Sequence, residues 1–341
     1  MISNLFYVII KLGIFKEAEI DMLENWKEFK KIVNESSSVF LMAHKDLDLD
    51  AINSCIGMDF YLKSIKKKSY IIIDDKKQEV GVKKVLENYN QNINVIRSRE
   101  VENLKDENSI LIILDTNKIK LVQNPEVIEL FTKVIIIDHH DKSKDTIKGN
   151  LIIIDTNGSS TCEMITNFLK DNEIKITKKL ATLLLAGIIL DTNYYRQKAD
   201  PETFYISYYL TKCGGEVTEV NELLKQDLKD YIKRQKIISS VKVVNKVAIG
   251  NGSQRIEYKK EEIAKAADSL LTFNKIEASF VVAKVDKDLI SISGRSIGDI
   301  NIGKILENFG GGGNEYEGAA KVEDSNIKKV TEELTKIIKN I

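Results

Sequence analysis

The segment VFLMAHKDLDLDAI (39–52) begins with an apolar run. One histidine comes next, and three aspartates at alternate positions follow it. The histidine is His44, and the acids are Asp46, Asp48 and Asp50. Like charges this close together repel one another unless a cation offsets them. A solvated surface turn would also tolerate them, so this segment alone is compatible with either a turn or a metal site.

Every histidine of the chain lies within two residues of an aspartate. There are three histidines, and His139 and His140 directly follow Asp138. Two further acids end apolar runs, Asp115 in LDTN and Asp191 in GIILDTN. Each acid alone is equally typical of a helix cap or a turn, but the whole set favours metal ligands. Carboxylates with imidazoles suit Mn²⁺ or Mg²⁺, with Zn²⁺ also open, and their number exceeds the needs of one ion. The sequence therefore predicts a two-metal site.

Elements that would bring these residues together are visible in the first half of the chain. Short β-branched apolar runs alternate there with amphipathic stretches, which predicts a parallel sheet with helices between the strands. Ligands gather beyond the carboxyl ends of such strands, where we expect the acids and histidines to meet. The expected strands are 38–43, 69–74, 109–114, 133–138 and 150–155.

The later part of the chain changes character twice. The expected helices are 159–171, 178–190, 201–213 and a charged segment, 219–240. Beyond it, the expected elements are strands at 241–250, 253–258, 278–285 and 289–295 and helices near 300–308 and 325–339. We therefore predict an α/β fold in which a helical linker joins the parallel-sheet domain to a smaller α+β domain. The expected parts are an N-terminal helical segment (1–35), a catalytic domain (36–218), a linker helix (219–240) and a second domain (241–341).

The composition argues against several classes of protein. Lys+Arg and Asp+Glu both number 51, so there is no overall charge excess to attract long duplex nucleic acid. Three widely spaced cysteines predict no disulfide framework and favour a reducing, cytoplasmic location. The N-terminal run MISNLFYVIIKLGIF is interrupted by Lys11 and is too short to span a membrane. We expect it to form a short packing or interfacial helix, or to be the remnant of an anchor.

The ordered motifs HKDLDLD, LDTN, IDHH, SSTCE and GIILDTN resemble those of the DHH phosphoesterase superfamily. The later SGRSIGDINIGKILENFGGGGNEYEGAA resembles the DHH-associated C-terminal domain, so the likeness covers roughly residues 36 to 340. Within the superfamily, MAHKDLDLDAI, GSSTCEMI and LLAGIILDTN are most similar to the catalytic part of bacterial cyclic-di-AMP phosphodiesterases. The larger members of that group carry membrane and sensory domains upstream.

The resemblance implies two ions bridged by Asp115, with Mn²⁺ favoured over Mg²⁺ or Zn²⁺. The ligands of one ion would be His44, Asp48 and Asp115, and those of the other would be Asp50, Asp115, His139 and Asp191. Asp138 would orient the histidines, and His140 would face the substrate phosphate. Asp46 falls outside the motif, in solvent or behind the ligands.

The resemblance also implies substrate contacts in both domains. They are His140, Ser160, Thr161, Arg295, Ser296, Gly311, Gly312, Gly313 and Asn314. For Ser160 and Thr161, which open a predicted helix, N-capping is an equally good interpretation. The family's glycine run normally ends in histidine, whereas this one ends in Asn314. Lys198 and Glu202 also stand where two arginines are expected, and Arg196 is a candidate to compensate.

Together these features imply a manganese-dependent enzyme that hydrolyses cyclic-di-AMP to linear pApA with a water activated between two metal ions. Two alternatives remain open. One is a short-oligoribonucleotide exonuclease or 3′-phosphoadenosine phosphatase, and the other is a cyclic-dinucleotide sensor without turnover. The expected partner is thus a cyclic dinucleotide or a short oligonucleotide, and a homodimer is left open.

Overall fold

The computed structural model describes residues 17–74, 78–89 and 93–340, and the chain divides into two units after Lys225. The apolar run at the N-terminus lies outside the described residues, which begin with α2 (Glu17–Glu35). Within the described ranges, no helix has both the length and the apolarity needed to cross a bilayer.

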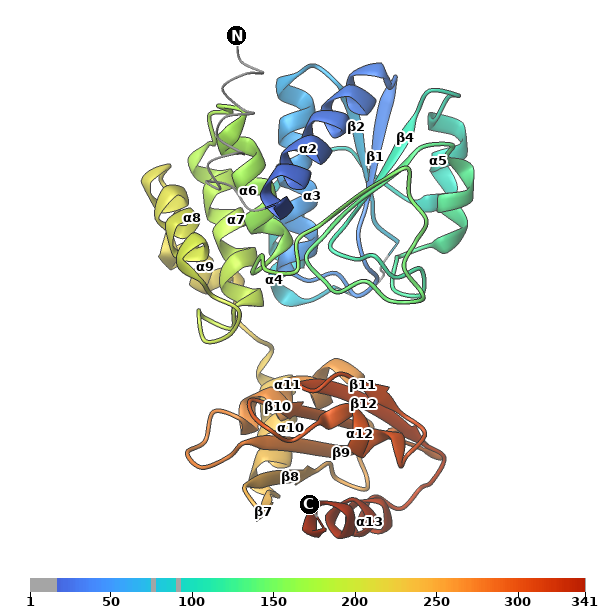
Figure 1. Ribbon diagram of the computed structural model, residues 1–341, viewed down its shortest axis with the longest axis vertical. Coiled ribbons are helices and arrows are strands. Elements are labelled where there is room, and N and C mark those ends of the chain that lie inside the picture. Colours follow the sequence, from blue (N-terminus) through green and yellow to red (C-terminus); the bar gives the residue numbers. More distant parts are fainter. Residues whose placement is uncertain (1–16, 75–77, 90–92, 341) are drawn as a thin grey trace. The chain divides into compact units, whose positions relative to one another are not determined.

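The first unit is built on a six-stranded sheet in which every pairing is parallel (Figure 1). The spatial order is β3-β2-β1-β4-β5-β6. The strands are β1 (Ser38–Met42), β2 (Lys68–Ile72), β3 (Val95–Ile96), β4 (Ile110–Leu114), β5 (Val134–Asp138) and β6 (Leu151–Ile154). This confirms the predicted α/β fold and the five predicted strands, whereas β3 has two residues and is too short to leave a pattern.

Alternate side chains of the central strands enter separate apolar cores on the two faces of this sheet. Leu41 and Ile112 belong to one core, and Phe40 and Leu111 belong to the other. This two-sided burial explains why the strands read as continuous apolar runs. Figure 1 shows α5 on the opposite side of the sheet from α3, α6 and α7. The helices of this unit after α2 are α3 (Leu49–Ser64), α4 (Val80–Tyr89), α5 (Ser98–Leu104), α6 (Thr161–Asp171), α7 (Lys178–Asp191), α8 (Pro201–Lys212) and α9 (Val217–Leu223).

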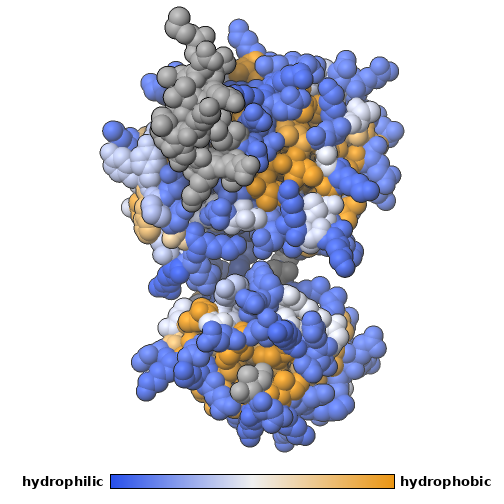
Figure 2. Space-filling model, viewed as in Figure 1, coloured by the Kyte–Doolittle hydropathy of each residue, from blue (hydrophilic) through white to orange (hydrophobic). Residues whose placement is uncertain are grey.

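The second unit contains a mixed sheet in the order β11-β12-β10-β9-β8-β7. Its strands are β7 (Lys242–Val244), β8 (Val247–Asn251), β9 (Ala278–Asp286), β10 (Leu289–Ser296), β11 (Gly312–Gly313) and β12 (Glu317–Val322). Its helices are α10 (Leu228–Ser239), α11 (Lys260–Leu270), α12 (Ile302–Glu307) and α13 (Ile327–Lys339). Apolar residues of α10 and α11 form one core against the sheet, and those of α12 and α13 form another. The visible face of both units is largely hydrophilic around local apolar patches (Figure 2).

The prediction of a strand at 253–258 is wrong, because this segment is a turn that leads into α11. The backbone N–H of Ile256 donates to the carbonyl of Ser253 at 3.1 Å, which closes the turn. Tyr258 is buried, with 3% of its surface exposed. Ile256 also packs against this core, so the alternation of Ile256 and Tyr258 reflects two anchoring side chains of a turn and not a pleated strand.

The prediction of a single helix at 219–240 is also wrong, because the structure has two helices there, α9 and α10. Asp227 begins the second as its N-cap, and its carboxylate accepts the backbone N–H of Lys229 at 2.7 Å. An N-capping residue has non-helical dihedral angles, so it separates the two helices within a segment whose charged composition suits a helix throughout.

Candidate metal centre

The junction of β1 and α3 supplies the first candidate ligands. His44 lies two residues beyond β1, and Asp48 is the N-cap of α3. The Asp48 carboxylate accepts the backbone N–H of Ala51 at 2.9 Å, which fixes its orientation. Its Oδ2 lies 3.6 Å from His44 Nε2. Asp50 follows in the first helical turn and is completely buried.

Asp115, directly after β4, lies between two histidines. Its Oδ2 is 3.3 Å from His44 Nε2, and its Oδ1 is 3.5 Å from His139 Nε2. Its backbone is left-handed, with φ of 61°, a conformation in which aspartate is enriched among non-glycine residues. The carboxylate thus presents one oxygen to each histidine.

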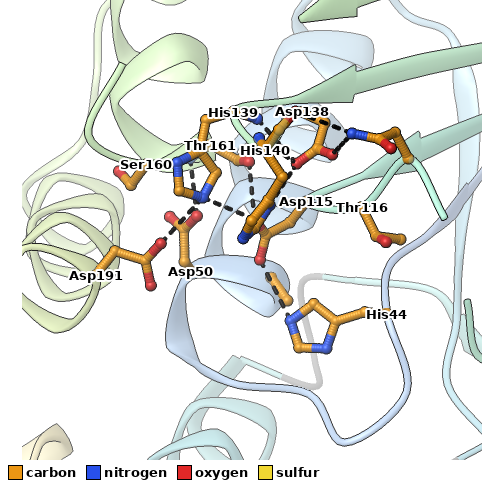
Figure 3. Close-up of polar contacts among 12 residues, drawn as sticks. His44, Asp50, Asp115, Thr116, Asp138, His139, His140, Ser160, Thr161 and Asp191 are labelled. Atoms are coloured by element: carbon orange, nitrogen blue, oxygen red, sulfur yellow. Dashed lines mark hydrogen bonds and ion pairs between the residues drawn. The ribbon is translucent and has the colours of Figure 1, made fainter. Parts of the chain in front are cut away.

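The carboxyl end of β5 and the end of α7 complete the cluster (Figure 3). His139 follows β5, and its Nε2 lies 3.1 Å from Oδ2 of Asp191, the last residue of α7. The structure forms three groups whose ligand atoms lie within 4.8 Å of one another: His44, Asp48 and Asp115; Asp50, His139 and Asp191; and Asp115, Asp138, His139 and His140. The first two, which we call the two ligand groups, correspond to the ligand sets that the resemblance implied, and Asp115 reaches the second of them through the contact of its Oδ1 with His139.

The environment of His139 fits a bound cation. Its side chain is buried, and neither ring nitrogen makes a hydrogen bond of good geometry among the described residues, although Nε2 faces the carboxylate oxygens of Asp191 and Asp115. Buried polar atoms are rarely left without a partner. Carboxylate oxygens together with imidazole nitrogens are suitable ligands for Mn²⁺, Mg²⁺ or Zn²⁺. The residues present therefore fit divalent metal ions.

The acids and histidines of the cluster shift one another's pKa values. Burial raises the pKa of Asp50 well above its ordinary value, and the negative charges of Asp115 and Asp191 raise it further. Burial lowers the pKa of His44, but the charge of Asp48 and hydrogen bonding to Asp115 outweigh burial and raise this pKa to about 12. Without a metal ion, the cluster therefore retains protons that the same groups would lose in water.

We expect Mn²⁺ binding to release protons and to weaken as the pH falls. The raised pKa of His44, about 12, means that its ring is protonated at neutral pH in the metal-free protein. A ring nitrogen must lose its proton before it can bind a metal ion. Affinity should therefore increase with pH across the neutral range. Calorimetric titrations with Mn²⁺ in buffers of different ionisation enthalpy would measure the release, and identical heats in all buffers would contradict it.

Asp138 connects the two adjacent histidines to the rest of the site. Its Oδ1 accepts the backbone N–H of His139 at 2.9 Å and lies 2.8 Å from Nδ1 of His140. Its Oδ2 accepts the side-chain amide of Asn117 at 2.7 Å. Both Asp138 and Asn117 are completely buried. Asn117 was not singled out from the sequence, where its only signal is its place two residues after Asp115 in LDTN.

Ser160 and Thr161, expected to contact substrate, are both completely buried. Ser160 is the N-cap of α6, and its hydroxyl accepts the backbone N–H of Glu163 at 3.1 Å. The hydroxyl of Thr161 donates to Asp115 Oδ1 at 3.0 Å. Asp46 is exposed and belongs to neither ligand group.

In the second unit, Arg295 is held by its neighbours on and beside β10. Its Nε donates to Asp268 Oδ1 at 2.7 Å, and its Nη1 donates to the Ser293 hydroxyl at 3.3 Å and to the Gly294 carbonyl at 3.0 Å. Ser296, at the end of the same strand, is 6% exposed. These contacts fix the orientation of the guanidinium.

The glycine run forms a tight β-hairpin in which Gly312 and Gly313 pair with β12. A Cβ atom at Gly311 would lie 2.4 Å from the carbonyl oxygen of Ala319, so the close approach of the strands requires glycine there. Gly313 has φ of 154°, which side chains also disfavour. The Asn314 side-chain oxygen accepts the N–H groups of the two residues at 316 and 317, both at 2.8 Å. Asn314 thus stabilises the turn of the hairpin.

Comparison with known proteins identifies both units. The DHH family N-terminal domain matches residues 38–188, and the DHHA1 domain matches residues 240–340. The cyclic-di-AMP phosphodiesterase GdpP of Bacillus subtilis is 32% identical over 89% of this chain and 48% of its own length. The chain therefore spans about half the length of the curated relatives it matches.

Two solved structures share the fold at lower identity. The superposition on an exopolyphosphatase-related protein from Bacteroides fragilis covers 93% of this chain and 97% of that protein's chain. Its TM-score is 0.78, and the two sequences are 18% identical. Exonuclease RecJ bound to manganese covers 94% of each chain, with a TM-score of 0.53 and 11% identity. Because two family domains follow one another in the expected order and a relative is 32% identical across most of the sequence, this chain belongs to the DHH family and carries a DHHA1 domain after its DHH domain.

Proposed function

We propose that this chain is a metal-dependent phosphodiesterase that hydrolyses cyclic-di-AMP to linear pApA. The observation that carries the proposal is the pair of ligand groups on either side of Asp115, with one carboxylate oxygen beside each histidine. The similarity to GdpP, a cyclic-di-AMP phosphodiesterase, supports this choice of substrate.

Two divalent ions, for which we propose Mn²⁺, would supply an acidified water and neutralise charge on the phosphoryl oxygens when bound. The proposed ligands of one ion are His44, Asp48 and Asp115, and those of the other are Asp50, Asp115, His139 and Asp191. Exonuclease RecJ, which shares the fold, was solved with manganese bound, and this supports the choice of metal.

We propose that His140 contacts the reacting phosphate. Its side chain is 46% exposed, unlike that of the buried His139. Because Nδ1 of His140 lies against Asp138, Nε2 is the ring nitrogen left for a phosphoryl oxygen. A covalent intermediate on Cys55 or Cys162 is not expected, because burial raises the pKa of both thiols and disfavours the reactive thiolate.

The second unit would bind the parts of the substrate that do not react. We propose Arg295 as its phosphate contact, because a guanidinium pairs well with phosphate and this one is already oriented by Asp268. The hairpin of Gly311, Gly312, Gly313 and Asn314, with Ser296, would contribute backbone and side-chain donors beside it.

A substrate panel tests the function. The purified chain is incubated with Mn²⁺ and, separately, cyclic-di-AMP, linear pApA, short oligoribonucleotides and 3′-phosphoadenosine, and the products are identified by mass. We expect pApA from cyclic-di-AMP, lost with a chelator and restored by added Mn²⁺. Mononucleotides from the linear substrates with cyclic-di-AMP left intact would support an exonuclease or phosphatase instead. Binding of cyclic-di-AMP without any product would support a sensor.

A further inference from the structure

The first turn of α6 contacts carboxylates from both ligand groups. Asp50 Oδ2 accepts the backbone N–H of Thr161, and Asp50 Oδ1 accepts that of Cys162, both at 2.8 Å. The Thr161 hydroxyl donates to Asp115 Oδ1 at 3.0 Å (Figure 3). Thr161 therefore touches Asp50 through its backbone and Asp115 through its side chain.

We propose that Thr161 is a positioning residue of the metal centre, whose hydroxyl fixes the plane of the Asp115 carboxylate. Asp115 must keep Oδ1 on the side of His139 and Oδ2 on the side of His44 in order to serve both ion positions. The hydrogen bond from Thr161 to Oδ1 opposes rotation of the carboxylate away from this arrangement. The inference rests on the metal centre of the proposed function, and it assigns Thr161 a different role from the substrate contact implied by the family resemblance.

Burial and bonding both favour this role over contact with substrate. Thr161 is completely buried, so a substrate would reach it only after the first turn of α6 had moved. Its hydroxyl has a single proton, and the structure directs that proton to Asp115. Its backbone N–H is likewise directed to Asp50. Neither donor of Thr161 is therefore left for a phosphate.

Gly187 of α7 keeps this turn close to the ligands. A Cβ atom at Gly187 would lie 2.4 Å from Cys162 Sγ and 2.9 Å from Asp50 Oδ1, both closer than carbon side-chain atoms tolerate. The first turn of α6 and the Asp50 carboxylate therefore occupy space that only glycine leaves free. The position of Thr161 is set by packing on one side and by hydrogen bonds to two carboxylates on the other.

The test compares Thr161→Val, which keeps the shape of the side chain but removes its hydroxyl, with Thr161→Ser, which keeps the hydroxyl. Each 341-residue variant is stripped of metal and titrated with Mn²⁺, with free Mn²⁺ followed by electron paramagnetic resonance. Removing a residue that hydrogen-bonds to a metal ligand typically lowers the affinity for the metal by about 10–100-fold. We expect a loss of that size for at least one Mn²⁺ in Thr161→Val, and near-normal binding in Thr161→Ser. Cyclic-di-AMP hydrolysis by Thr161→Val should recover at high Mn²⁺ concentration.

Unchanged Mn²⁺ affinity in Thr161→Val would overturn the proposal, and an accompanying rise in KM for cyclic-di-AMP would assign Thr161 to substrate binding. Circular dichroism reports whether each variant is folded. If Thr161→Val does not fold, Thr161→Ala replaces it, with the same loss of Mn²⁺ affinity expected and normal affinity again overturning the idea. The titration does not depend on the substrate, so failure of the unchanged chain to hydrolyse cyclic-di-AMP would contradict the proposed function and leave the test of Thr161 intact.

Discussion

Asp115→Asn is expected to abolish phosphodiester hydrolysis and leave the fold intact. Asparagine has the same shape, but its side chain offers one acceptor oxygen where Asp115 offers two, one beside His44 and one beside His139. Mutating a residue that only hydrogen-bonds to a metal ligand typically costs about 10–100-fold in activity. Because Asp115 is itself the proposed shared ligand, its loss should lower kcat/KM by more than about 100-fold. Hydrolysis of cyclic-di-AMP, Mn²⁺ affinity and the thermal midpoint would each be measured.

Asp46→Asn is a closely matched control. Asp46 also has a left-handed backbone, with φ of 57°, and it lies in the same segment as His44. Asparagine tolerates this conformation well, so neither substitution should strain the chain. Asp46 is exposed and outside both ligand groups. Surface substitutions usually change stability by no more than about 0.5 kcal/mol, and this one removes no proposed ligand, so we expect activity to change less than about twofold. Comparable losses of activity in the two variants would contradict the assignment of Asp115 as the shared ligand.

The sequence predicted the sheet and the meeting of the ligands because both depend on simple rules. Strands buried on both faces must be apolar throughout, as ILIIL in β4 and VIIID in β5 are. Once those strands are parallel, Asp115 and His139 must lie at the same edge of the sheet. Asp50 and Asp191 lie on helices, so this rule for strands does not pair them, and their shared ligand group was expected only from the family resemblance.

The roles of individual polar side chains could not be predicted in the same way. Thr161 follows a helix cap in the sequence, and only the approach of α6 to Asp115 shows where its hydroxyl points. Asn117 is one polar residue among many until its amide is seen against the buried Asp138. In the sequence, Asn314 likewise stands where the family has a histidine and was expected to contact substrate. In the structure, its side-chain oxygen accepts two N–H groups of its own turn. The roles of Thr161 and Asn117 depend on distances of a few ångströms between segments far apart in the sequence, and that of Asn314 depends on the conformation of one turn.

Asp138→Ala is expected to lower both activity and stability, because one buried carboxylate serves several donors. Its loss removes the acceptor for the backbone N–H of His139, for Nδ1 of His140 and for the amide of Asn117. Each buried donor left without a partner costs roughly 1–3 kcal/mol. We expect the free energy of unfolding to fall by about 2–4 kcal/mol, since water entering the space left behind would satisfy some donors.

The same substitution separates support of the histidines from general destabilisation. With His140 free to turn, kcat/KM should fall by about 10–100-fold even at temperatures where the variant is fully folded. Asp141→Ala, three residues beyond β5 and exposed, should change neither urea unfolding nor hydrolysis. If Asp138→Ala loses stability but keeps full activity when folded, Asp138 supports only the fold, and the orientation of His140 does not depend on it.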